Sequence, residues 1–138
     1  MSTFNNFNDS LVTEFRANGG KVSGQFANAN LLLLTTTGAK SGKPRVNPLV
    51  YTIDGDRMVI MASKGGAPTN PDWYHNLVAN PVVTVEVGGE QFQARATIAE
   101  GPERERLFSQ MTQQLPNFAG YQQKTTRPIP IVLLERMD

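Results

Sequence analysis

The chain has 138 residues, of which 39% are hydrophobic and 18% charged, a composition that predicts one globular domain and excludes a disordered or fibrous protein. Thirteen basic and twelve acidic residues give a formal charge of +1, so composition provides no argument for general nucleic-acid binding. The absence of cysteine excludes disulfides, thiolate metal sites and cysteine nucleophiles, and the single histidine, His75, excludes two-histidine metal motifs.

A helix is the first predicted element. Phe4, Phe7, Leu11 and Phe15 recur at helical spacing on one face, and Gly19-Gly20 would end the helix. We expect this apolar face to pack on the rest of the domain. Contact with a membrane surface is the alternative, although the polar face lacks a lysine-rich band. The expected organisation is an amphipathic helix over residues 1–20 and a compact domain over residues 21–138.

The first half of the compact domain is predicted to be a meander of three strands. They cover Leu31–Thr36, Arg45–Ile53 and Met58–Ala62, and the last two are joined by an Asp54-Gly55-Asp56 turn. Pro48 has no N–H donor, which indicates that the second strand lies at a sheet edge or contains a bulge.

The second half combines helices with three further strands. Asn70-Pro71 predicts the start of a short helix that ends near Ala79, with Asn70 as its cap. The remaining elements, in order, are a hairpin of Val82–Val87 and Gln91–Ile98, a helix from Gly101 to Leu115, a polar loop carrying Phe118 and Tyr121, and a central strand Ile129–Leu134. Six strands joined mostly by tight turns predict a mainly antiparallel sheet that closes into a small barrel with flanking helices.

Two basic turns are the first candidate binding features. Lys40-Ser41-Gly42-Lys43 follows the first predicted strand, and Ser63-Lys64-Gly65-Gly66 follows the third. Free backbone N–H groups, a hydroxyl and cationic side chains in such turns can converge on an anion such as phosphate. If the first and third strands flank the second, both turns would face one phosphorylated ligand. The alternative is a solvated hairpin tip, and the glycine spacing of a P-loop is absent.

Aromatic residues near these turns suit a flat ring system. Trp73 and Tyr74 lie on the helix after the second basic turn, where they could contact such a ring; the alternative for Trp73 is the core. His75 is expected to be exposed, and proton transfer is the lesser reading for it. Phe118 and Tyr121 could form a lid over a pocket or a plug at the barrel end.

Three motifs in a fixed order carry a specific resemblance. They read Leu-Thr-Thr-Thr-Gly-Ala-Lys-Ser-Gly-Lys-Pro-Arg-Val-Asn-Pro-Leu from Leu34, Ala-Ser-Lys-Gly-Gly from Ala62 and Asn-Pro-Asp-Trp-Tyr-His-Asn-Leu from Asn70. With these motifs and Arg-Pro-Ile-Pro-Ile-Val from Arg127, the chain resembles the deazaflavin-dependent nitroreductase family of actinobacteria. The resemblance implies a split β-barrel that binds coenzyme F-420, a deazaflavin with an anionic phosphate and oligoglutamate tail.

The resemblance implies roles for particular positions. Lys40, Ser41 and Arg45 would hold the phosphate, with Lys64 near the phosphate or the tail. The ring and linker would contact Val46, Asn47, Pro48, Leu49, Val50 and Tyr51 on one strand, Met61, Ala62 and Ser63 on the opposite strand, and Trp73, Tyr74 and Asn76. Leu115, Phe118 and Tyr121 would face the substrate.

The sequence departs from the family pattern at two places. Ala39 stands where a family member carries a basic residue, which removes one anion contact. The substrate loop, which carries three tyrosines in the family, here has Leu115, Phe118 and Tyr121, so two phenolic donors are missing. The more apolar pocket argues against nitroimidazole activation and favours bulky cyclic enones or quinones.

The activity that the resemblance implies is hydride transfer from reduced coenzyme F-420, an 8-hydroxy-5-deazaflavin, to enones, unsaturated lactones or quinones, with nitro compounds as a further class. Tyr121 or solvent would supply the proton, Ser63 would hydrogen-bond the acceptor oxygen, and no metal is required. A non-catalytic deazaflavin, flavin or haem-binding protein is the alternative, and a nucleic-acid binder is a weaker third reading. We expect a cytoplasmic monomer without a nucleic-acid partner, and leave open a peripheral contact of the first helix with the inner face of the cell membrane.

Overall fold

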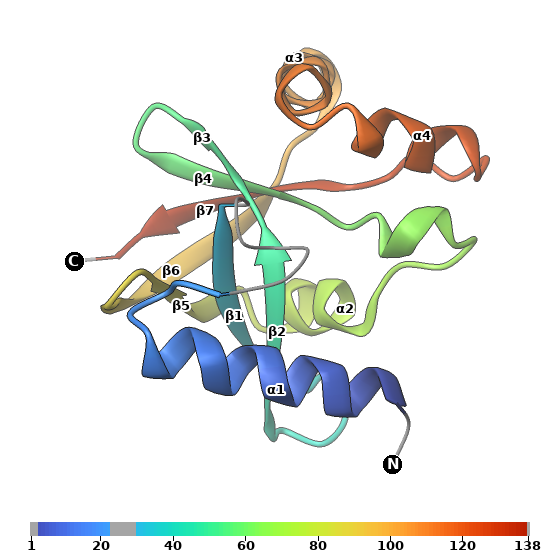
Figure 1. Cartoon of the computed structure of the whole chain (residues 1–138). Helices are drawn as coiled ribbons and strands as arrows, with labels where there is room; N and C mark the ends of the chain where they lie inside the picture. The colour runs from blue at the N-terminus through green and yellow to red at the C-terminus, as the bar shows by residue number, and fades with distance from the viewer. Residues whose placement is uncertain (1–2, 23–29, 138) are drawn as a thin grey trace.

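The computed structural model describes residues 3–22 and 30–137, except the side chains of residues 3–8, 65 and 117. Figure 1 shows the arrangement of its helices and strands. In chain order the elements are α1 (Thr3–Ala17), β1 (Leu31–Thr37), β2 (Pro44–Val50), β3 (Thr52–Asp54), β4 (Arg57–Met61), the 3-10 helix η2 (Lys64–Gly66), α2 (Asp72–Ala79), β5 (Val82–Val87), β6 (Glu90–Ile98), α3 (Gly101–Gln114), α4 (Asn117–Gln123) and β7 (Ile131–Arg136).

The strands form one sheet in the order β2-β1-β5-β6-β7-β4-β3, and all neighbouring pairs are antiparallel. The two edge strands, β2 and β3, are consecutive in the chain and separated only by Tyr51, so the ends of the sheet are brought together and the sheet curls into a barrel. No ladder joins β2 to β4 in the described ranges, which leaves the barrel split there. The predicted antiparallel split barrel with flanking helices is confirmed.

Over the described residues the sheet has seven strands rather than the predicted six, because the expected strand Arg45–Ile53 is broken at Tyr51. The Tyr51 N–H donates to the Asn30 C=O at 3.0 Å instead of to a neighbouring strand. Residues before the break pair with β1, and residues after it pair with β4. Pro48 lies on the edge strand β2, as its missing N–H predicts.

Helix α1 packs on β1 and β2, which confirms the packing interpretation for the residues that can be described. Leu11 is 7% exposed and Phe15 is 1% exposed, and both belong to an apolar cluster with β1 side chains. The side chains of Phe4 and Phe7 lie outside the described residues. In the part of the chain that is described, no helix has the length and apolar character needed to cross a bilayer.

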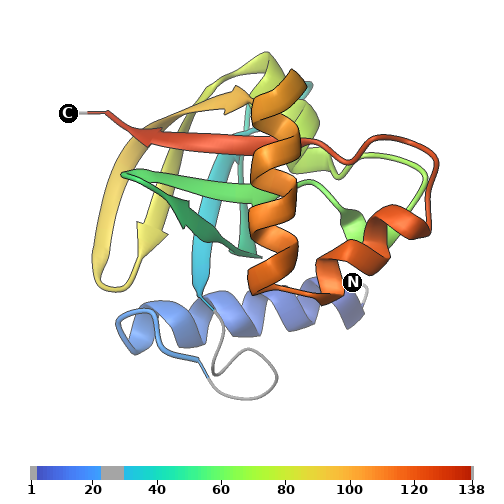
Figure 2. The same cartoon turned by 90° about the horizontal axis from the view of Figure 1, so that it is seen from above.

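Strand β7 is buried on both faces, as its continuous apolar run predicts. Val132 and Leu134 belong to the core inside the barrel, whereas Ile131 and Leu133 belong to a second core with Leu107 of α3. Figure 2 shows α3 crossing β7 and β4 on the outside of the barrel. At β7 the sheet therefore separates the core inside the barrel from the core under α3.

Two local predictions in the second half are wrong. Asn70 does not cap α2, since Pro71 occupies the cap position and Asn70 Oδ1 accepts a hydrogen bond from Arg127 at 2.7 Å. The segment predicted as a polar loop forms α4, because Phe118 and Tyr121 pack against the core under α3. Tertiary packing stabilises this helix of 7 residues, which is too short to be stable alone.

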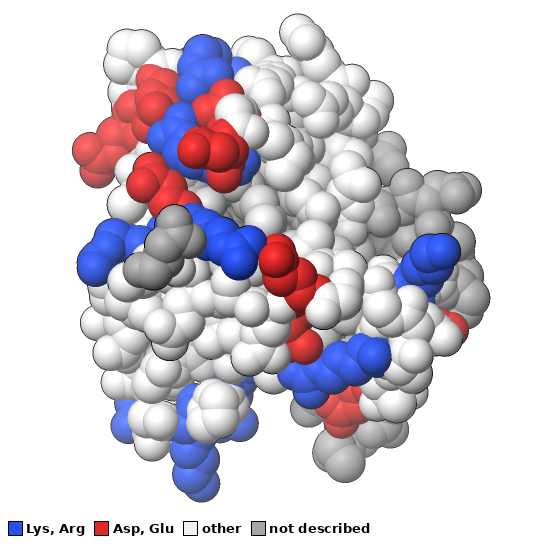
Figure 3. Space-filling model, turned by 90° about the vertical axis from the view of Figure 1, so that its left-hand side faces the viewer, with Lys and Arg blue, Asp and Glu red and all other residues white. Residues whose placement is uncertain are grey.

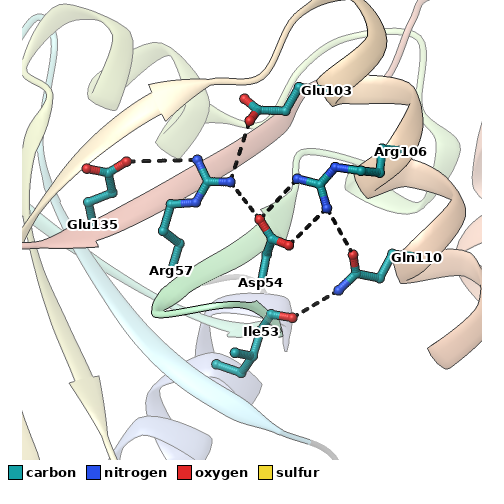
Figure 4. Close-up of polar contacts among 7 residues, drawn as sticks. All are labelled: Ile53, Asp54, Arg57, Glu103, Arg106, Gln110 and Glu135. Atoms are coloured by element: carbon teal, nitrogen blue, oxygen red, sulfur yellow. Dashed lines mark hydrogen bonds and ion pairs between the residues drawn. The ribbon is translucent and has the colours of Figure 1, made fainter.

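An ion-pair cluster fastens the β3–β4 hairpin to α3 (Figure 4). The Asp54 carboxylate accepts hydrogen bonds from Arg106 at 3.0 and 3.2 Å and from Arg57 at 2.6 Å. Arg57 also lies 3.5 Å from Glu103 and 3.9 Å from Glu135. The hydrogen bonds from Arg106 and Arg57 lower the pKa of Asp54 to about 2.

Asp54→Asn should destabilise the protein by about 1 to 2 kcal/mol at neutral pH, because it removes the carboxylate that both arginines contact. The folded pKa of Asp54 is below its unfolded value, so this stabilisation is present above pH 3.8 and is lost as the pH falls through about 2. Urea unfolding at several pH values measures the difference, which should shrink towards pH 2. Asp56→Asn, exposed in the same turn, is the control and should leave the free energy of unfolding unchanged. A pH-independent difference for Asp54→Asn would contradict the assignment.

Candidate functional site

The turn between β1 and β2 is shaped by its own hydrogen bonds. The Gly38 N–H donates to the Lys43 C=O at 2.8 Å, and the Gly42 N–H donates to the Gly38 C=O at 2.9 Å. The Ser41 hydroxyl oxygen accepts the Lys43 N–H at 3.2 Å. The N–H groups of Lys40 and Ser41 donate to no group in the described part of the chain. They are therefore available to an anion.

Asn76 anchors this turn to α2. Its side chain is buried, its Oδ1 accepts the Ala39 N–H at 2.9 Å, and its Nδ2 donates to Thr36 Oγ1 at 3.1 Å. The resemblance assigns Asn76 to the cofactor. In the structure its amide positions the turn that carries Lys40 and Ser41.

An open groove of about 1290 Å³ runs beside the turn. Its walls are the turn, the start of β2, the first part of α2 and one side of α1. Of the residues assigned to the cofactor, it contains Lys40, Ser41, Arg45, Val46, Asn47, Trp73 and Asn76. Helix α1 and helix α2 add Asp9, Val12, Thr13, Arg16, Asp72 and His75.

Positive charge in the groove is concentrated at the turn. Lys40 and Arg45 have no acidic partner in the described ranges. Arg16 on the facing helix, by contrast, forms a 2.8 Å ion pair with Glu86 on β5. The acidic residues Asp9 and Asp72 lie on the other walls. Figure 3 shows a group of blue atoms without adjacent red atoms at the lower left, and Figure 1 places this turn at the lower end of the molecule. The turn therefore offers unneutralised cations to an anionic ligand.

Other residues assigned to the cofactor lie beside the groove or in the cores. Pro48, Leu49, Val50 and Tyr51 are half-buried along β2 and at its end, and Tyr74 is half-buried on α2. Met61 and Ala62 are only 5% and 0% exposed, and the Ala62 N–H donates to the Pro130 C=O at 2.9 Å. The Met61 and Ala62 side chains contribute to packing, and their assignment to the cofactor stays a prediction.

The second basic turn lies apart from the groove. Lys64 Nζ donates to Thr69 Oγ1 at 3.3 Å, and neither Lys64 nor Ser63 lines the groove. The 3-10 helix η2 packs instead against α4, where a Cβ at Gly66 would lie 2.9 Å from the Tyr121 carbonyl oxygen. The groove therefore brings together the first basic turn and α2, without the second basic turn that we expected to share the ligand.

The aromatic residues assigned to the substrate lie together on α4. The ring centroids of Phe118 and Tyr121 are 5.3 Å apart, and both rings are half-buried against the core under α3. Leu115, also half-buried, follows α3 directly. The hydroxyls of Tyr121 and Ser63 make no hydrogen bond in the described part of the chain, so both are free to contact a ligand.

Sequence reasoning missed two contributions to this region. Val12, Thr13 and Arg16 line the groove, although α1 was expected only to pack on the domain. Arg127 holds the segment that carries Ser63, although the sequence showed it only as part of a motif. Neither contribution has a local signal, because each depends on contacts with a distant part of the chain.

The family described as F420H(2)-dependent quinone reductase matches residues 9–136 of this chain. An F420H(2)-dependent quinone reductase of Mycobacterium tuberculosis is 42% identical over 126 residues, which cover 88% of this chain and 85% of that protein.

Solved structures show the same similarity. One described as an F420-H2 dependent reductase has a TM-score of 0.71 at 42% identity, covering 77% of this chain and 94% of that chain. Another, described as a domain-swapped dimer, has a TM-score of 0.73 at 37% identity, covering 92% of this chain and 93% of that chain. The description of that relative as a dimer gives no support to the monomer expected from the sequence. The match over residues 9–136 shows that the chain belongs to the F420H(2)-dependent quinone reductase family.

Proposed function

We propose that this protein is a reductase that uses reduced coenzyme F-420 to reduce a quinone. The observation that supports this best is the β1–β2 turn beside an open groove. Within residues 3–22 and 30–137, Lys40 and Arg45 there have no acidic partner and the N–H groups of Lys40 and Ser41 are free. The family match and the quinone reductase relative support the same cofactor and the same class of acceptor.

The residues of the turn fit the anionic end of the cofactor. Cationic side chains and successive free N–H groups are the donors that phosphate oxygens prefer. From the turn, β2 leads to Tyr51 at the split between the two ends of the sheet. As an edge strand, β2 has one side without a neighbouring strand, along which a flat ring system could lie. When bound, the reduced deazaflavin supplies a hydride to the acceptor.

The acceptor side of the proposed site consists of Ser63 and the side chains on and near α4. The Ser63 and Tyr121 hydroxyls are unpaired in the described part of the chain, so each can donate a hydrogen bond to an acceptor oxygen. Leu115 and Phe118 provide apolar surface in place of hydroxyl donors. This surface favours quinones first and cyclic enones or unsaturated lactones second, with nitro compounds the least favoured class.

Tyr121→Phe should lower kcat about tenfold or more while leaving the Kd of coenzyme F-420 within about twofold of wild type, because only the acceptor loses a donor. Steady-state kinetics with menadione and a binding titration with the cofactor measure the two quantities. Equal kcat values for the variant and the wild type would show that Tyr121 does not deliver the proton.

Purified protein mixed with reduced coenzyme F-420 and menadione tests the proposed function, with turnover followed through the deazaflavin absorbance. Turnover supports the reductase. Tight cofactor binding without turnover of menadione or a cyclic enone would favour a non-catalytic binding protein instead. Affinity for polyanions without affinity for the deazaflavin would favour a nucleic-acid binder.

The assembly to test first is a dimer, because a relative 37% identical to this chain is described as a domain-swapped dimer. In a domain-swapped dimer, each barrel is completed by an element that comes from the other copy. Light scattering on the purified protein measures the mass directly, and a monomeric mass would support the expectation drawn from the sequence.

A further inference from the structure

Arg127, in the connection between α4 and β7, donates hydrogen bonds to four groups of the segment 62–70. Its Nε donates to the Ala67 C=O at 2.9 Å, and its Nη2 donates to the Ser63 C=O at 2.8 Å. Its Nη1 donates to the Ala62 C=O at 3.3 Å and to Asn70 Oδ1 at 2.7 Å. One guanidinium therefore holds the beginning, the middle and the end of this segment.

All four acceptors of Arg127 are neutral carbonyl oxygens, and no carboxylate pairs with it in the described ranges. Burial without a counter-charge lowers the pKa of Arg127. A planar guanidinium presents several N–H donors in a fixed fork, which the single ammonium group of lysine does not reproduce. Contact with four carbonyls at once therefore depends on the geometry of arginine and not on its charge alone.

The held segment is constrained on its other side by α4. Lys64 has a φ of 48°, in the left-handed region that side chains rarely adopt. Gly66 has a φ of 84°, and a Cβ there would lie 2.9 Å from the Tyr121 carbonyl oxygen. Gln122, also on α4, donates from Nε2 to the Arg127 C=O at 2.8 Å. Arg127 thus connects the segment that carries Ser63 to the helix that carries Tyr121.

We propose that Arg127 is a positioning residue, which holds the Ser63 hydroxyl in a fixed place relative to Tyr121. This inference rests on the proposed function, since it takes Ser63 and Tyr121 to face the bound quinone. A small displacement of a group that contacts the reacting atoms lowers the rate of the chemical step even when binding is unchanged. The four hydrogen bonds from Arg127 to the segment 62–70 are called the clamp below. The clamp and its effect on the reaction can be measured separately.

Limited trypsin digestion of the cofactor-free protein tests the clamp. Trypsin cuts after Lys64, and Arg127→Lys should accelerate this cut about tenfold or more, because the released segment can enter the protease. Arg95→Lys is the matched control, since Arg95 is exposed on β6 and makes no side-chain contact of this kind in the described part of the chain. It should leave the cut after Lys64 at the wild-type rate. An unchanged rate in Arg127→Lys would overturn the clamp.

Steady-state kinetics with reduced coenzyme F-420 and menadione test the effect on the reaction. Arg127→Lys should lower kcat about tenfold or more, with the KM for menadione and the Kd of the cofactor within about twofold of wild type. A wild-type kcat would overturn the positioning role, as would a weakened cofactor affinity at constant kcat. If the wild-type protein shows no turnover, the proposed function and the positioning role both fail, while the digestion still decides whether the clamp exists.

Asn70 provides a second pair of variants if Arg127→Lys does not fold. Asn70→Ala removes the 2.7 Å hydrogen bond and leaves the guanidinium in place, so the cut after Lys64 should accelerate and kcat should fall. Asn70→Asp keeps an acceptor oxygen at the same position and should return both rates close to wild type. If Asn70→Asp behaves like Asn70→Ala, the hydrogen bond does not position the segment and the proposal is overturned.

Discussion

Replacing Arg45 by alanine should weaken the binding of coenzyme F-420 at least about tenfold, which corresponds to roughly 1.5 kcal/mol for a lost charge-assisted hydrogen bond. Arg45 is exposed, lines the groove and has no acidic partner in the ranges that the structure describes. Among these residues no carboxylate therefore competes with a phosphate for its guanidinium. By contrast, Arg16 on the facing helix is already paired with Glu86. A fluorescence or calorimetric titration with the cofactor measures the change.

Lys43→Ala is the matched control for the loss of one positive charge. Lys43 belongs to the same turn but does not line the groove, so its removal changes the overall charge without removing a groove contact. We expect the Kd to stay within about twofold of wild type at physiological salt. Equal losses in the two variants would indicate a diffuse electrostatic effect, and an unchanged affinity in Arg45→Ala would place the phosphate elsewhere.

Gly20→Ala should lower the free energy of unfolding by about 3 kcal/mol. Gly20 has a φ of 94°, and a Cβ there would lie 2.6 Å from the Gly88 Cα and 2.8 Å from the Gly88 N. Both atoms belong to the backbone of the β5–β6 turn, which cannot rotate away as a flexible side chain can. Helix α1 would have to shift, and because α1 lines the groove, the affinity for coenzyme F-420 should fall as well.

Gly19→Ala separates the cost of the backbone conformation from the cost of the clash. Gly19 has a φ of 62° where α1 ends, and a Cβ there would have no neighbour within 4 Å. We expect a loss of about 1 kcal/mol, measured by urea unfolding, and an unchanged cofactor affinity. Equal destabilisation by the two substitutions would show that the close approach of Gly20 to Gly88 is unimportant.

Most of the elements could be predicted because their signals are local. Gly88-Gly89 between alternating residues predicts the β5–β6 hairpin, and the apolar run of β7 predicts a strand buried on both faces. Helix α4 was missed, since Pro116 and Gly120 are typical of a turn. Its stability comes from Phe118 and Tyr121 packing on a core built by other segments, which no window of the sequence contains.

The basic turn between Lys40 and Arg45 could be recognised as a candidate anion site from the chain itself, because its glycine, hydroxyl and cations are neighbours in sequence. The residues that surround the turn in space could not be recognised in this way. Asn76 anchors the turn from 37 residues away, and α1 supplies the facing wall, while Lys64 lies outside the groove despite its similar turn. Composition and short-range spacing are properties of the chain, whereas these contacts depend on the path that the backbone takes in space, and only packing of the whole sheet and its helices decides that path.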